Sequence, residues 1–195
     1  MTYAPIAASV AAATLGPTAL LLARQRMHSP WAPGISETAA VAAITGIGFA
    51  LVLYGPQPAA VLVPLVLLGP AAAIVDAREG RLPDLLTGPL LGTTVLVALG
   101  SGSAGLRGIA VAAFATAGAS LVATLPGAML GWGDVKLIPT LTIVVSHQNA
   151  LLEGLIHAVL LVAVTAVIVG LRERRSVVPY GPALVFGTLG AAAGL

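Results

Sequence analysis

Long apolar runs separated by short polar stretches occupy most of the chain. A helix needs roughly 20 apolar residues to cross a bilayer, and eight stretches approach or reach that length. None of them alternates polar and apolar residues as the strands of a membrane barrel do. The eight stretches are Ala4–Ala23, Thr38–Tyr54, Ala59–Val75, Leu85–Leu99, Gly108–Leu130, Leu137–Val145, Ala150–Leu171 and Val177–Leu195. The pattern predicts an all-α polytopic membrane protein with about eight transmembrane helices.

The composition supports a membrane environment. Hydrophobic residues make up 58% of the 195 residues and charged residues 8%, whereas a soluble domain carries roughly 25% charged residues. A compact soluble fold of this length cannot bury so much apolar surface. The absence of cysteine excludes disulfides and thiolate metal sites. The net charge of +2 comes with no basic patch, so we expect a lipid bilayer and no nucleic acid as partner.

The basic residues predict an orientation, because Lys and Arg favour the cytoplasmic side. With the N-terminus outside and eight spans, all the basic residues except Arg107 fall on the cytoplasmic side. Without the short sixth span, residues 172–175 and their three arginines would move outside, so eight spans fit better than seven. Residues 24–37 then form a short cytoplasmic linker, and residues 1–195 form a single membrane-embedded domain.

Two carboxylates stand at predicted cytoplasmic helix ends. Asp76 follows the third stretch and Asp134 precedes the sixth, and the topology places them at the same membrane depth although 58 residues separate them. Two close carboxylates do not both ionise easily, so one keeps a proton while the other takes one from water. This is the arrangement for aspartic proteolysis. From the topology alone, a simpler explanation is that each aspartate only caps a helix or extends to the membrane interface.

The sequence around each aspartate adds detail. Glycines flank Trp132 in Gly131-Trp132-Gly133-Asp134, and glycine permits positive φ and close backbone approach. We therefore expect Asp134 in a tight turn. After Asp76, Pro83 stiffens the return to the membrane and Asp84 is expected to cap the next helix.

These segments resemble the paired signatures of the type IV prepilin peptidases, which are membrane aspartic proteases. That family has an Asp followed seven residues later by Pro, then a Gly-x-Gly-Asp-x-Lys segment, and a late Pro-Phe-Gly-Pro stretch. The corresponding segments here are Asp76 with Leu82-Pro83-Asp84, then Gly131 to Lys136, then Val178-Pro179-Tyr180-Gly181-Pro182-Ala183. Three matches in this order favour catalysis over capping.

The resemblance, which covers about residues 59–195, implies a function and a site. It implies a GxGD-type core in which Asp76 and Asp134 are the catalytic pair. The implied activity is removal of the leader from type IV prepilin-like or tight-adherence pilin precursors, at the cytoplasmic face of the bacterial cytoplasmic membrane. The residues expected to shape the site are Pro83, Gly131, Gly133, Lys136, Pro179, Gly181 and Pro182.

One departure from the family is informative. Larger members carry a cytoplasmic insertion with two Cys-x-x-Cys pairs that hold zinc, together with N-methyltransferase activity. Here residues 24–37 stand in that place and contain no cysteine. The chain therefore resembles the short, peptidase-only members, for which we expect no metal, no cofactor and no methyltransferase activity.

Several points stay open at this stage. Lys136 is expected to contact lipid headgroups or a substrate carboxylate. Arg78, Glu79 and Arg81 either shape the site, bind the charged leader of a substrate, or form a solvated loop. The pair Glu153 and His157, spaced i,i+4, is either a structural pair or a proton relay. The alternative function is that of a non-catalytic polytopic protein, either a transporter or a degenerate assembly partner. The oligomeric state is left open.

Overall fold

The computed structural model describes every residue except 1–3, 26–31, 55–59, 127–130, 174–179 and 194–195. Its described part is all-helical and contains no strand, which confirms the all-α part of the predicted fold class. The elements are α1 (Ala4–Arg24), α2 (Ile35–Tyr54), the 3₁₀ turn η1 (Ala60–Leu62), α3 (Val63–Glu79), α4 (Asp84–Gly100), α5 (Ser103–Ala123), α6 (Trp132–His147), α7 (Leu151–Glu173) and α8 (Gly181–Ala193).

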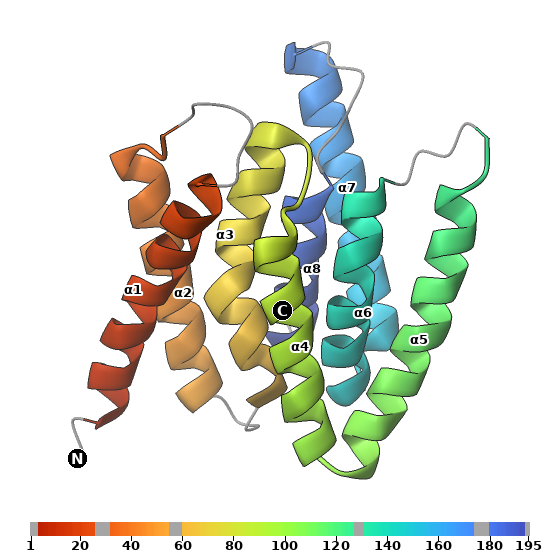
Figure 1. Ribbon diagram of the computed structural model, residues 1–195, viewed down its shortest axis with the longest axis horizontal. Coiled ribbons are helices and arrows are strands. Elements are labelled where there is room, and N and C mark those ends of the chain that lie inside the picture. Colours follow the sequence, from red (N-terminus) through yellow and green to blue (C-terminus); the bar gives the residue numbers. More distant parts are fainter. Residues whose placement is uncertain (1–3, 26–31, 55–59, 127–130, 174–179, 194–195) are drawn as a thin grey trace.

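Successive helices run in alternating directions, so the molecule is an up-and-down bundle (Figure 1). α3 lies near its centre and packs against α1, α2, α4 and α8, while α6 packs against α4, α5 and α8. Each of the eight α-helices in the part of the chain that the structure describes overlaps one predicted apolar stretch. Both the end of α3 and the start of α6 lie at the upper end of the bundle in Figure 1.

Among the described residues, four helical segments are long and apolar enough to cross a membrane, namely Ile6–Arg24, Ile35–Tyr54, Ala60–Glu79 and Ser103–Ala123. The third of these is mostly buried inside the bundle, whereas the other three present large apolar side chains on the outside. Phe114 on α5, for example, is 80% exposed. Such an outer surface matches lipid, which is as apolar as these side chains. The count of eight spans and the outward N-terminus stay predictions.

The third helix ends later than predicted, and the sixth extends beyond its predicted bounds at both ends. α3 continues past Val75 to Glu79, and Gly80, with φ of 65°, ends it in the left-handed conformation. Asp76 therefore lies inside the last turn of α3 and not beyond its end. Likewise α6 begins at Trp132, so Asp134 lies in its first turn. Apolar runs underestimate these helices because charged residues continue a helix where it leaves the apolar region.

The fifth helix is shifted toward the N-terminus. It begins at Ser103 after Gly102, whose φ is 68°, and it ends at Ala123 rather than at Leu130. Pro126 accounts for the earlier end, because the residue before a proline is disfavoured in a helix. As a result Arg107 lies within α5, where it donates a hydrogen bond to Asn149 Oδ1 at 2.9 Å.

Candidate functional site

Asp76 and Asp134 come together at one end of the bundle. Asp76 is in the last turn of α3 and Asp134 in the first turn of α6, and the residues are 4% and 7% exposed. Their carboxylates are close enough to repel each other electrostatically. α4 and α8 each pack against both α3 and α6. The tertiary packing of four helices therefore brings together two carboxylates that are far apart in the sequence.

The backbone of Gly181 holds the Asp76 carboxylate. Gly181 is the first residue of α8, and its amide N–H donates to Asp76 Oδ2 at 2.8 Å. A Cβ atom at position 181 would lie 2.6 Å from the same oxygen and 2.9 Å from Asp76 Cβ and Cγ. Real Cβ atoms do not approach other heavy atoms so closely, so only glycine lets this backbone reach the carboxylate.

Asp134 is held in a related way by its own N-terminal turn. Gly131 is the N-cap of α6, and its backbone amide hydrogen-bonds to the Asp134 carboxylate. The tight turn predicted here is wrong, because Gly131 has a φ of −78° and Gly133 is already part of the helix. A Cβ at Gly133 would lie 3.5 Å from Leu82 N, an ordinary contact. The loop before α4 thus lies against the first turn of α6.

The predicted cap at Asp84 is also wrong. Pro83 is the N-cap of α4, in an extended conformation, and no side chain caps the helix. Asp84 instead forms an ion pair with Lys136, whose Nζ donates to Asp84 Oδ1 at 2.5 Å and joins the start of α4 to the start of α6. Lys136 was expected to contact lipid headgroups or a substrate carboxylate, and the sequence did not predict its ion pair with Asp84. Both side chains are substantially exposed, and exposed pairs contribute only about 0–1 kcal/mol.

A second ion pair joins α2 to α3. Arg78 binds Glu37, with Nε donating to Oε1 at 2.8 Å. The topology predicted both residues at the same end of the bundle, but nothing in the sequence pairs a base on one helix with an acid 41 residues earlier. Arg78 therefore lies in the last turn of α3, paired with Glu37, and not in a solvated loop.

Three other residues singled out in the sequence are Pro182, Pro179 and Glu153. Pro182 is partly buried as the second residue of α8, next to Gly181. Pro179 lies outside the described residues, as does the side chain of Glu153. Within the described part of the chain, no three His, Asp or Glu side chains converge as metal ligands.

The geometry suits one kind of chemistry. Two adjacent carboxylates removed from water share a proton readily, so that one acts as a base while the other acts as an acid. Each carboxylate keeps one oxygen near a glycine amide, which fixes its orientation. Such a pair can activate a water molecule and polarise a carbonyl at the same time.

Comparison with known proteins identifies the region that carries both aspartates. Residues 61–171, more than half of the chain, match the model of the type IV leader peptidase family. The matched region includes α4 and α5 together with Asp76 and Asp134, and it ends before α8. No curated protein and no solved structure shows a significant match to the chain.

Proposed function

The chain belongs to the type IV leader peptidase family, and from this premise we propose that it is an intramembrane aspartic endopeptidase. Its substrate class is the prepilin-like or tight-adherence pilin precursor, in which a short leader precedes an apolar helix. Cleavage releases the leader at the cytoplasmic face of the bacterial cytoplasmic membrane. The main observation that supports this proposal is the buried pair Asp76 and Asp134, which two helices bring together.

In the proposed reaction the two carboxylates hold one proton between them. The ionised carboxylate takes a proton from water while the water oxygen attacks the carbonyl carbon of the scissile peptide bond. The protonated carboxylate donates its proton to the carbonyl oxygen. The tetrahedral intermediate then collapses as one of its hydroxyl groups returns a proton to the carboxylate that had donated one. The C–N bond breaks, and the leaving nitrogen takes a proton from the carboxylate that had accepted one from water. All atoms of the water molecule end in the two products.

The glycine amides support this proposal by orienting the pair. The Gly181 nitrogen lies 2.8 Å from Asp76 Oδ2. Its N–H therefore occupies one carboxylate oxygen and leaves the other for water or substrate. Gly131 acts in the same way on Asp134. General acid–base catalysis requires its groups to stay within hydrogen-bonding reach of the reacting atoms, and backbone donors are more rigid than side chains.

The test is cleavage of a co-expressed precursor with a basic leader and a following apolar helix, read as a shift on a gel. Asp76→Asn and Asp134→Asn are each expected to abolish cleavage while the protein still accumulates in the membrane. Because the two groups act as one unit, the double variant should be no worse than either single variant.

Asp84→Asn is the matched control, since it makes the same substitution at an exposed carboxylate on the same end of the bundle. It should retain most of the activity. Normal cleavage by both Asp76→Asn and Asp134→Asn would refute the protease proposal and favour a non-catalytic membrane protein.

A further inference from the structure

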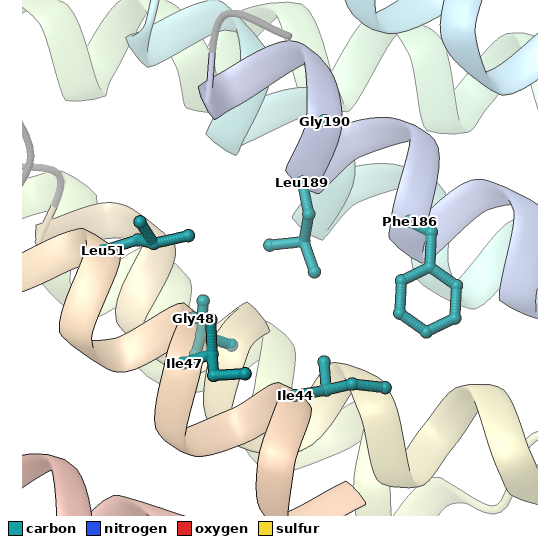
Figure 2. Close-up of a pocket in the computed structure, with 8 residues that line it drawn as sticks. Ile44, Ile47, Gly48, Leu51, Phe186, Leu189 and Gly190 are labelled. Carbon is teal, nitrogen blue, oxygen red and sulfur yellow. The ribbon is translucent and has the colours of Figure 1, made fainter. Parts of the chain in front are cut away.

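An apolar groove runs along the bundle below Asp76, between α2 and α8. It has a volume of about 340 Å³ and is lined by Ile44, Ile47, Gly48, Leu51, Val66, Phe186, Leu189 and Gly190. Figure 2 shows Ile44, Ile47 and Leu51 on one helix facing Phe186 and Leu189 on the other. α3 packs against both α2 and α8 and contributes Val66 to the lining.

The groove shares two of its helices, α3 and α8, with the candidate active site. On α8, Phe186 and Leu189 follow Gly181 by five and eight residues, which corresponds to about 8 Å and 12 Å along a helix. On α3, Val66 precedes Asp76 by ten residues, or about 15 Å. The same two helices that fix the Asp76 carboxylate therefore also form the groove, which begins within a few turns of it.

The lining excludes a polar ligand. All eight residues are apolar or glycine, and none is ionisable. Two further apolar grooves, one between α1 and α2 and one among α1, α3 and α4, contain no residue of α8. The groove between α2 and α8 is thus distinguished from them by its continuity with the helix that carries Gly181.

We propose that this groove receives the apolar transmembrane helix of the substrate, immediately after the scissile bond. The proposal rests on the proposed function and deepens it by assigning a docking surface and a register. A substrate helix whose scissile bond lies at the depth of Asp76 runs parallel to α8. Its fifth residue after the bond then lies beside Phe186 and its eighth beside Leu189, because both helices rise about 1.5 Å per residue.

The absence of cysteine from the chain allows a direct test. Leu189→Cys is combined with Asp76→Asn, so that the precursor stays uncut, and single cysteines are scanned along the precursor helix. Disulfide formation in native membranes should peak about eight residues after the scissile bond and recur one helical turn away. With Phe186→Cys the peak should move about three residues toward the bond. Phe114→Cys on the outer face of α5 is the control and should give no peak.

A second variant tests the same surface by cleavage. Ile44→Trp in an otherwise unmodified chain fills the groove and should slow cleavage of the full precursor at least 10-fold. The matched control Leu106→Trp, on the outer face of α5, should cleave normally.

The outcomes separate the two proposals. If the unmodified protein leaves the precursor uncut, the proposed function fails. If it cuts the precursor, while Leu189→Cys forms no cross-link and Ile44→Trp cleaves normally, the groove proposal fails and the function stands. Cross-links between two copies of this chain, with none to the precursor, would assign the groove to self-association and overturn the proposal as well.

Discussion

Substituting Gly181 by alanine tests how closely the two carboxylates depend on backbone geometry. The added Cβ would lie 2.6 Å from Asp76 Oδ2, and an ordinary contact begins near 3.4 Å, so the carboxylate and α8 must separate by roughly 0.8 Å. The hydrogen bond of 2.8 Å from the Gly181 amide would lengthen beyond its useful range. The variant therefore changes the position of Asp76 without changing its chemistry.

Two separate estimates give the loss of cleavage rate expected for Gly181→Ala. A displacement of about 1 Å at a catalytic group costs on the order of 100-fold in rate. Hydrogen bonds to charged groups contribute about 1.5–3 kcal/mol, and 1.36 kcal/mol corresponds to a tenfold change in rate, so losing this bond costs about 10- to 150-fold. We expect Gly181→Ala to cleave the precursor roughly 100-fold more slowly.

The assay is the initial rate of precursor cleavage in detergent or native membranes, at equal amounts of folded protein. Gly92→Ala on α4 is the matched control, because a Cβ there meets no atom within 4 Å and alanine favours the helix. It should cleave at the unmodified rate. A normal rate for Gly181→Ala would show that the position of Asp76 does not depend on this amide, and would contradict the reasoning.

Three further predictions concern packing, topology and mechanism. Gly105→Ala places a Cβ 1.7 Å from the carbonyl oxygen of Ala98, so we expect a loss of stability of about 1–3 kcal/mol in thermal unfolding, whereas Gly118→Ala on the same helix meets nothing and should unfold normally. A reporter fused after Arg175 should be cytoplasmic and one inserted at Ser101 external; reversed labels would overturn the predicted orientation. Cleavage should persist in EDTA and thiol reagents, because the carboxylates activate water themselves and the chain contains no cysteine; loss of activity that zinc restores would point to a metal mechanism.

The sequence predicted the helices well and their ends poorly. Eight apolar stretches correspond to eight helices because lipid-facing and buried positions both require apolar residues. The ends depend on local backbone features. Gly80 ends α3 only one turn after Asp76. At the start of α6, the charged residues Asp134 and Lys136 interrupt the apolar run, so the run begins later than the helix does. The aspartates, predicted just beyond the ends of their apolar stretches, therefore lie within the terminal turns of α3 and α6.

The sequence predicted which residues belong to the candidate site, but it did not predict the contacts that these residues make. The motifs singled out Asp76, Asp134 and Gly181, and the structure gathers all three. The ion pair of Lys136 with Asp84 could not be predicted, because the contact depends on how α4 lies against α6. Sequence spacing describes neighbours along one helix, whereas such pairs form between helices.

The distance along the chain between Asp76 and its hydrogen-bond donor has a consequence for synthesis. The amide of Gly181 comes 105 residues after the carboxylate that it holds, and at ribosomal rates of about 5–20 residues per second this interval takes roughly 5–20 s. In the later part of this interval both aspartates have been synthesised, but α8, whose Gly181 amide orients Asp76, has not. A nascent chain is therefore expected to stay inactive toward precursors inserted beside it until α8 has docked, so proteolysis begins only when the bundle is assembled.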